Sequence, residues 1–323
     1  MQATARSNEV NSVRVGMTAH GKNGCPPADE TPAGAVAVSG SAGTGSGLPG
    51  ATIIPDFVVR TSSCLENPAA GLRPLPAGGA ARSALPGRLV SPAATLTLVD
   101  LGSLARWLAA AGDDPALEAL LAPVERDQLS RYQNPKRRLE WLGGRLAAKH
   151  CLQQLAAAGL IATLLPQEYP ILADAHGRPG VDWTGRTGTP PALSISHCRG
   201  YAAALACTGS ACGLDIEPVA PRLANVQARF TTPEEVALLH ALPEPLARLA
   251  VLWTAKEAVK KCFLHDEPTF VSRISLIAVT IDPADPVLTL RCRVAGPRDL
   301  TPMVRVTAVD DCLLACTEAI DHA

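Results

Sequence analysis

The sequence predicts an α+β protein in which helices and strands are mixed along two halves of similar size within residues 95–323. Strand-like alternation of apolar residues begins at residue 95 and returns in four segments after residue 274. Apolar residues at helical spacing indicate long helices within residues 124–158 and 244–263. The length of 323 residues suits one large domain or two ordinary ones.

The first half is expected to alternate between the two element types. In order, its elements are a strand at 95–99, short helices at 101–111 and 115–121, a long helix signal within 124–158, and strands at 169–172 and 192–196. The long helix has an apolar side with Leu139, Leu142 and Leu146, and a basic side that runs from Lys136 to Lys149. The segment Gly177-Arg178-Pro179-Gly180 is typical of a turn.

The second half has the same mixed character. Strands at 201–207 and 212–216 are expected to pair around the turn Thr208-Gly209-Ser210. A helix begins at Thr232, with Pro233 at its first position and two acids in its first turn. The remaining elements are a helix at 244–263 and strands at 274–281, 287–294, 304–309 and 313–318.

Residues 1–92 differ from the rest of the chain. They are rich in Gly, Ala, Pro, Ser and Thr, a composition that buries too little apolar area to offset chain entropy. We expect a disordered extension there, in which residues 53–59 form at most a transient strand. A linker and an upstream start site are both compatible with this composition.

Composition narrows the class of protein. The formal net charge is −1, which gives no global basis for binding nucleic acid or a membrane surface. The ten cysteines include no CxxC pair and no zinc-like spacing with His, so reduced, scattered thiols are expected. A secretory signal and a long apolar run are absent from the sequence, which makes the cytoplasm the expected location.

Three carboxylates form the main candidate site. Asp215 and Glu217 are two apart on an expected strand, so they share one face of it. Glu257 and Lys261 are four apart on an expected helix and share a face as well. Three oxygen ligands beside a lysine suit a hard divalent cation that holds a phosphate. A solvated strand edge is the competing interpretation of Asp215 and Glu217.

The motifs around these residues resemble the signature of the 4′-phosphopantetheinyl transferase superfamily. The resemblance covers about residues 95–320 and rests on five segments in order: the basic helix with Gly144-Arg145, Gly177-Arg178-Pro179, Ser194-Ile195-Ser196-His197, Gly213-x-Asp215-x-Glu217 and Trp253-x-x-Lys256-Glu257-Ala258. Residues 1–92 have no counterpart in this pattern.

The resemblance implies a reaction, its partners and a fold. The phosphopantetheine arm of coenzyme A is transferred to a serine of an apo acyl or peptidyl carrier protein, and adenosine 3′,5′-bisphosphate leaves. The nucleophile therefore belongs to the partner protein. After the extension at 1–92, which composition alone predicts to be disordered, the implied architecture is a pseudo-dimer of two α/β halves, at 93–205 and 206–323, with the site in the cleft between them. Such a pseudo-dimer needs no second subunit, so a monomer is expected.

The resemblance also implies roles for individual residues. Mg²⁺, or Mn²⁺, is held by Asp215, Glu217 and Glu257, and Glu257 is also a candidate base for the serine proton. Lys261 meets the pyrophosphate and ranks above Lys256, which faces another way on the helix. The expected coenzyme A contacts are Arg138, Arg145, Arg178, Ser196 and His197. Arg137 is an alternative to Arg138.

Two other functions stay open. A non-catalytic relative that binds coenzyme A or a carrier protein is the first, although the intact acidic residues favour turnover. A magnesium-dependent hydrolase of nucleotide pyrophosphates is the second.

Overall fold

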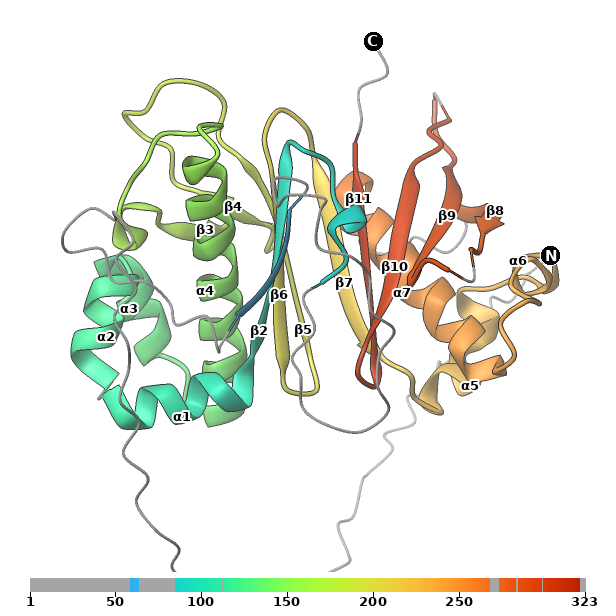
Figure 1. The fold of residues 1–323 in the computed structure, drawn as a ribbon, viewed down its shortest axis with the longest axis horizontal. Coiled ribbons are helices and arrows are strands. Elements are labelled where there is room, and N and C mark those ends of the chain that lie inside the picture. Colours follow the sequence, from blue (N-terminus) through green and yellow to red (C-terminus); the bar gives the residue numbers. More distant parts are fainter. Residues whose placement is uncertain are drawn as a thin grey trace, which may run out of the picture. The chain divides into compact units, whose positions relative to one another are not determined.

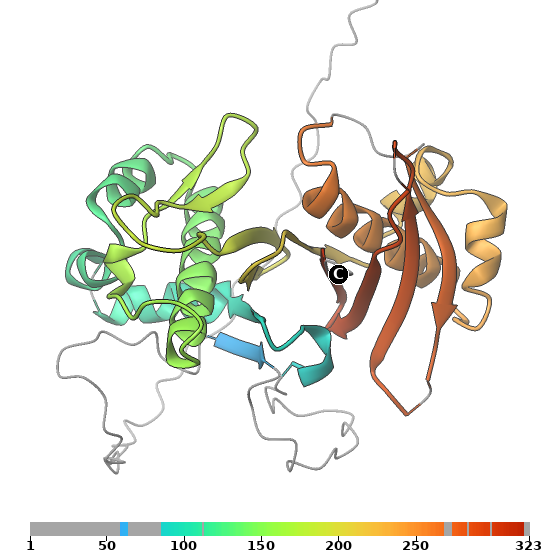
Figure 2. The same cartoon turned by 90° about the horizontal axis from the view of Figure 1, so that it is seen from above.

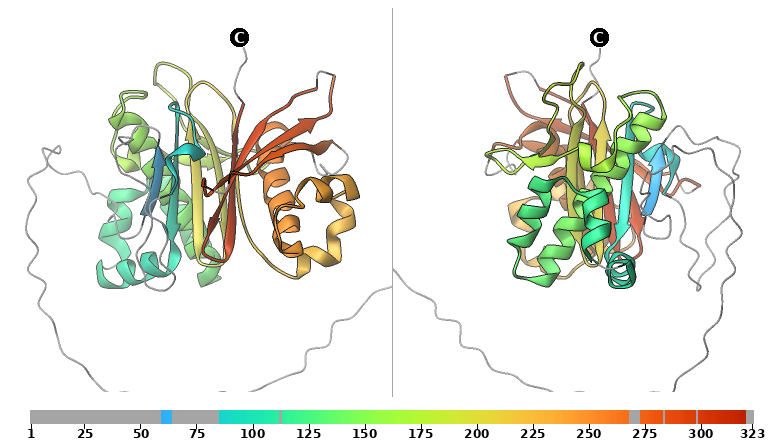
Figure 3. Two further views of the ribbon diagram at one scale, coloured as in Figure 1. Left: turned by 45° about the vertical axis from the view of Figure 1, so that its right-hand side comes forward. Right: turned by 90° about the vertical axis from the view of Figure 1, so that its left-hand side faces the viewer.

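Two antiparallel sheets organise the chain in the computed structural model. The structure describes residues 59–63, 85–111, 113–267, 273–282, 284–297 and 299–319, all within the compact unit Leu48–Ala323. The first sheet has the strand order β1-β2-β6-β5-β4-β3, and the second has the order β7-β11-β10-β9-β8. Helices cover one face of each sheet, and the other faces turn toward each other (Figures 1 and 3).

The elements follow one another in nearly the predicted order. In the first sheet and its helices these are β1 (Val59–Ser63), η1 (Gly87–Leu89), β2 (Ala94–Asp100), α1 (Leu101–Ala111), α2 (Asp113–Leu120), α3 (Pro123–Ser130), α4 (Pro135–Ala157), η2 (Pro166–Glu168), β3 (Ile171–Ala173), β4 (Pro179–Val181), β5 (Ala192–Cys198) and β6 (Tyr201–Cys207). The second group comprises β7 (Cys212–Pro218), α5 (Arg222–Val226), η3 (Gln227–Arg229), α6 (Pro233–Leu238), α7 (Pro245–Phe263), β8 (Ile274–Thr280), β9 (Val287–Val294), β10 (Met303–Val309) and β11 (Cys312–Glu318).

The two sheets share one topology. In each, a first strand (β2 or β7) leads through helices to a long helix (α4 or α7), and four strands then return so that the last pairs with the first. The views from the front and from above show α4 and α7 on opposite sides of the two sheets (Figure 2). The mixed α+β class is therefore confirmed.

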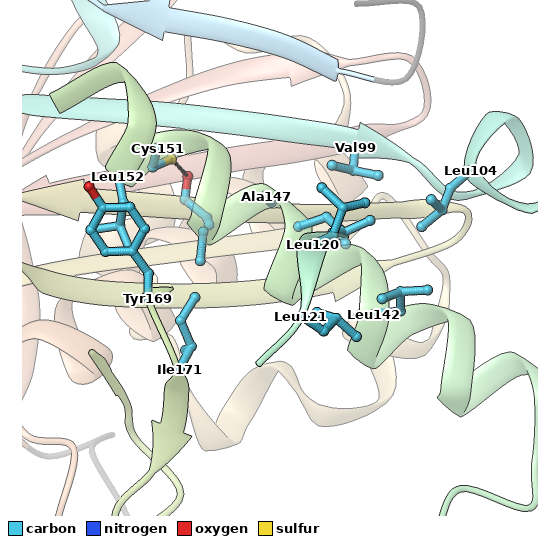
Figure 4. Close-up of a cluster of buried hydrophobic side chains, with 14 of the residues drawn as sticks. Val99, Leu104, Leu120, Leu121, Leu142, Ala147, Cys151, Leu152, Tyr169 and Ile171 are labelled. Carbon is cyan, nitrogen blue, oxygen red and sulfur yellow. Dashed lines mark hydrogen bonds between the residues drawn. The ribbon is translucent and has the colours of Figure 1, made fainter. Parts of the chain in front are cut away.

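The first core lies between α4 and its sheet. Leu142, Ala147 and Leu152 on α4 are completely or almost completely buried, as is Tyr169, which lies near β3 (Figure 4). The long helix signal divides into α3 and α4 because Pro135 starts a new helix. The side chain of Asn134 caps α4 by accepting a hydrogen bond from the Arg137 amide.

A buried ion pair recurs in both halves. Lys256 on α7 lies 2.7 Å from Glu235 on α6, whose carboxylate also accepts from the Leu276 amide of β8. In the first half, Lys149 on α4 lies 2.8 Å from Glu125 on α3, which accepts from the amide of Ile171 in β3. The matching arrangement ties each long helix to the first strand that follows it, and it gives Lys256 a structural role away from the candidate site.

Another core lies between the two sheets, and it corrects the expected extent of the disordered extension. Leu85, Leu89 and Val90 are buried there against apolar residues of β2, β6, β7 and β11. The folded part of the chain therefore begins before residue 93, because these side chains close the space between the sheets. The remainder of the extension lies outside the described residues, apart from β1.

Strand β1 was not predicted, and one strand pairing was predicted wrongly. Of the expected transient strand at 53–59, only Val59 lies within the described residues; it begins β1, which pairs antiparallel with β2. Strands β6 and β7 were expected to pair, yet β6 pairs with β2 and β5, and β7 pairs with β11. The expected hairpin does not form, because β7 pairs with β11 in the second sheet. In the described part of the chain, no helix is long and apolar enough to cross a membrane.

Candidate active site

The site is built where β7 lies directly on α7. Gly213 makes this approach close, because a Cβ atom at this position would lie 1.9 Å from the Ala258 carbonyl oxygen. Strand alternation then turns Asp215 and Glu217 to the α7 side, whereas Leu214 and Ile216 enter the core between the sheets. The two-residue spacing of Asp215 and Glu217 thus places both side chains on one face of β7, as the sequence indicated.

Asp215 is the most buried carboxylate of the site, with 4% of its surface exposed. Its Oδ1 accepts hydrogen bonds from Ser196 Oγ and from Lys261 Nζ, both at 2.8 Å. Its Oδ2 is buried and has no hydrogen-bond partner among the described residues. A buried carboxylate oxygen without a partner is costly, so this atom is suited to meet a cation.

Glu217 lies nearer the surface and is held by two side chains. Arg222 donates to its Oε2 at 2.6 Å, and the Trp253 indole donates to its Oε1 at 3.4 Å. Burial, followed by the negative charge of Asp215, raises the pKa of Glu217 above its ordinary value. Trp253, which also packs against the core of the second half, therefore helps to orient a site residue.

Glu257 shares the electrostatic environment of the other two carboxylates. Burial raises its pKa, and the charges of Asp215 and Glu217 add to the effect, while Lys260 and Lys261 oppose it. Such mutual repulsion is what a bound cation relieves. No group of three His, Cys, Asp or Glu side chains in the described regions is already gathered in a metal-binding arrangement.

The serines of β5 join the two sheets at the site. Ser194 Oγ accepts from the Leu214 amide at 2.9 Å, and Ser196 Oγ accepts from the Ile216 amide at 3.4 Å while donating to Asp215. Ser196 was predicted to contact coenzyme A; its contacts in the structure are with β7. The sequence did not indicate this role, because the contact between β5 and β7 joins strands of two different sheets.

His197 follows Ser196 on β5, and 49% of its side-chain surface is exposed. Its Nδ1 lies 3.7 Å from Glu140 Oε2 on α4. Partial burial lowers the pKa of His197, and this outweighs the opposing effect of Glu140. The imidazole is therefore mainly neutral at pH 7 in this structure and presents a hydrogen-bond donor.

Arg178 lies in its predicted turn, where Gly177 has a φ of 82°. The Asp174 side chain accepts from the Arg178 amide at 2.9 Å and fixes the turn. The guanidinium reaches the other half of the molecule, with Nη1 3.5 Å from Nδ1 of His265, just after α7. The sequence did not single out His265, because its proximity to Arg178 arises only from the fold.

The comparisons with known proteins agree with the acidic motifs. The model of the 4′-phosphopantetheinyl transferase superfamily matches residues 211–296, which contain Asp215, Glu217 and Glu257. A holo-[acyl-carrier-protein] synthase of Staphylococcus epidermidis is 34% identical over 27% of this chain and 71% of its own length. The chain belongs to the 4′-phosphopantetheinyl transferase superfamily.

Further relatives extend the match beyond that region. The holo-[acyl-carrier-protein] synthase of Geobacillus kaustophilus is 38% identical over 27% of this chain and 66% of its own length. A Synechocystis protein named as a candidate 4′-phosphopantetheinyl transferase is 31% identical over 46% of this chain and 58% of its own length. A solved holo-(acyl-carrier-protein) synthase of Bacillus anthracis, in complex with coenzyme A (3′,5′-ADP), is 24% identical over 34% of this chain and 90% of that one, with a TM-score of 0.29.

Arg145 and Arg138, the two predicted coenzyme A contacts on the basic helix α4, differ in their exposure to solvent. Arg145 is buried, with 8% of its surface exposed, and its guanidinium lies 4.6 Å from the centre of the Trp141 ring. Burial lowers its pKa, while Glu125 and Tyr132 oppose the shift. The structure therefore places Arg145 in the interior of the first half. Arg138 is partly exposed in the first turn of α4.

The residues present fit a hard divalent cation. The donors are carboxylates, and one of them has a buried oxygen without a partner among the described residues. Burial, together with repulsion from the neighbouring carboxylates, raises the pKa values of Glu217 and Glu257. In this structure Lys261 forms an ion pair with Asp215, and Arg222 forms one with Glu217. Binding of a cation would therefore require these ion pairs to loosen and the carboxylates to turn.

Proposed function

We propose that this chain transfers the 4′-phosphopantetheine arm of coenzyme A to a serine of an apo acyl or peptidyl carrier protein, in a magnesium-dependent reaction that releases adenosine 3′,5′-bisphosphate. The observation that carries the proposal is the placement of Asp215 and Glu217 on the α7 side of β7, with Lys261 bonded to Asp215. The superfamily match over residues 211–296 supports the same assignment.

The three carboxylates would hold the metal. Asp215, Glu217 and Glu257 would bind Mg²⁺, which supplies charge neutralisation at the pyrophosphate when bound. Mn²⁺ offers the same preference for oxygen ligands and remains an alternative. Phosphoryl transfer depends mainly on positioning and electrostatics, so a chain without its own nucleophile suits this chemistry.

Two residues on one face of α7 would act on the reacting groups. Glu257 would accept the serine proton, directly or through water, because burial raises its pKa toward the working range of a general base. Lys261 would balance negative charge on the departing phosphate; its ammonium lies at the site through its contact with Asp215. Ser196 would position Asp215 through its hydroxyl.

Coenzyme A would be held by basic and polar groups from the first half. His197 would donate to a phosphate, and Arg178 would contact the 3′-phosphate with its bidentate guanidinium. Arg138 would add a further anchor. Arg145 would act indirectly, since its buried guanidinium lies over the ring of Trp141 on the same helix. We also propose that the two halves form a pseudo-dimer with the site between them, that the enzyme is a monomer, and that it acts in the cytoplasm.

A transfer assay tests the proposal. The full chain is incubated with coenzyme A, Mg²⁺ and each of several apo carrier proteins, and the carriers are weighed by mass spectrometry. At least one carrier should gain the mass of one phosphopantetheine arm. Asp215→Ala should lower the rate by more than about 100-fold, because loss of even a supporting partner of a metal ligand costs ~10–100-fold. An unchanged rate in this variant would show that the metal assignment is wrong.

A coenzyme-A-binding relative without turnover is the second candidate. Its support is that Lys261 and Arg222 form ion pairs with Asp215 and Glu217 in this structure. It predicts binding of coenzyme A with no gain of mass by any carrier. A pyrophosphate hydrolase instead predicts release of adenosine 3′,5′-bisphosphate when no carrier is present.

A further inference from the structure

The tips of two hairpins meet at the junction of the sheets. One tip joins β5 to β6, and the other joins β10 to β11. Arg199 lies 3.1 Å from Asp311, and the Tyr201 hydroxyl donates to the carboxylate of Asp310. These polar contacts hold the two turns against each other.

A pair of thiols lies beside these contacts. Cys198 ends β5 in the first sheet, and Cys312 begins β11 in the second, 114 residues later. Cys198 donates a weak hydrogen bond to Cys312, with 3.2 Å between the sulfur atoms. A disulfide bond is ~2.04 Å long, so the sulfurs need to approach by only about 1.2 Å. Both cysteines are free in this structure.

We propose that Cys198 and Cys312 are an oxidation site at which a peroxide forms a disulfide between the two sheets. The sulfur of Cys198 first attacks the peroxide oxygen; the O–O bond breaks, and Cys198 becomes a sulfenic acid. The sulfur of Cys312 then attacks the sulfenic sulfur, the S–O bond breaks, and water leaves. With hydrogen peroxide, two thiols and one peroxide give one disulfide and two waters.

The order of these steps follows from exposure. Cys198 is partly exposed, whereas Cys312 has 1% of its surface exposed, so the oxidant meets Cys198 first. The hydrogen bond to Cys312 and burial raise the pKa of Cys198, which makes its oxidation slow in neutral buffer. An alkaline buffer therefore suits the experiment.

The chain contains a second thiol pair for comparison. Cys207 and Cys212 flank the short connection between β6 and β7, and a hydrogen bond between them contributes most to raising the pKa of Cys207. Both have no exposed surface, so a peroxide in solution has no direct access to them. Solvent access, and not proximity alone, thus distinguishes the proposed site.

The bond would stiffen the region beside the candidate active site. Cys198 directly follows His197, and Cys312 is paired in strand register with Pro218, the residue after Glu217. Closing a loop of this length restricts the unfolded chain strongly. The midpoint of thermal unfolding should rise by about 5–10 °C on oxidation.

The test uses the full chain in hydrogen peroxide at pH 8.5. Remaining thiols are alkylated, the protein is digested without reductant, and the peptides are identified by mass spectrometry. We expect a linked peptide that contains Cys198 and Cys312, disappears on reduction, and accompanies the rise in the unfolding midpoint. Cys207→Ser should retain both effects, and Cys198→Ser and Cys312→Ser should each lose them.

Three results would overturn the proposal. One is oxidation of Cys198 to a sulfinic acid without a link to Cys312. Another is a link between Cys207 and Cys212 in place of the expected one. The third is a rise in the unfolding midpoint that Cys198→Ser and Cys312→Ser both retain. Two single variants are used so that misfolding of one leaves the other as a test.

Discussion

Gly213 is the point at which β7 lies closest to α7, and Gly213→Ala is expected to separate them. The added Cβ would lie 1.9 Å from the Ala258 oxygen and 2.8 Å from the Cys262 nitrogen. Both are backbone atoms, so no side-chain rotation relieves the clash. Reaching an ordinary contact requires a shift of about 1.5 Å, and overpacking on this scale costs ~3 kcal/mol.

This cost has two measurable consequences. The midpoint of thermal unfolding should fall by about 6–12 °C, measured by circular dichroism or calorimetry. Transfer should fall by about 100-fold in the folded variant, because a misplacement of ~1 Å between Asp215 and Glu257 is enough for such a loss. The mass-spectrometric assay at a temperature where the variant stays folded measures the second effect.

Gly102→Ala is the matched control. Gly102 lies in α1, and its Cβ would lie 3.4 Å from the nearest atom, Asp100 Oδ1 at the end of β2, which is an ordinary contact. It should stabilise the chain by about 0.5–1 kcal/mol, since alanine is the better helix former, and leave transfer unchanged. If Gly213→Ala had the unfolding midpoint and transfer rate of the wild-type protein, the close contact of β7 with α7 would be refuted.

Three further predictions concern side chains that can gain or lose a proton. Glu235→Ala leaves the buried Lys256 without its charge partner and should lower the free energy of unfolding in urea by ~3–5 kcal/mol, whereas Glu235→Leu with Lys256→Met should cost far less; equal losses would contradict this. Burial lowers the pKa of His197, so the unfolded chain binds a proton more readily than the folded chain as the pH falls below ~6.5. The wild-type protein should therefore lose stability relative to His197→Asn between pH 7 and pH 5. Parallel curves of stability against pH for the two proteins would count against this prediction. Lys261→Met should lower kcat for transfer by about 100-fold in the transfer assay, and an unchanged kcat would remove Lys261 from the proposed chemistry.

Much of the fold could be predicted because its elements have strong periodic patterns. The range 287–294 coincides with β9, and Thr232 caps α6 by accepting from the Glu235 amide as expected. The segment with Leu85 and Leu89 was missed because its apolar residues stand among small ones and form no periodic pattern. Their burial depends on two sheets that meet only in the folded chain.

The candidate site was predicted in part. The spacing of Asp215 and Glu217 and the helix that carries Lys261 were enough to place these residues near one another. The partners that now hold them, Ser196 and Arg222, were not predicted, because a hydrogen bond to β5 and an ion pair to α5 depend on tertiary positions. Local spacing thus predicts which groups gather, and packing decides what each one touches.

The proposed transfer is tested most directly by weighing apo carrier proteins after incubation with this chain, coenzyme A and Mg²⁺. We expect the gain of one phosphopantetheine arm on a serine, dependent on Mg²⁺ and lost with Asp215→Ala. Binding of coenzyme A with no gain of mass across the panel of carriers would contradict it.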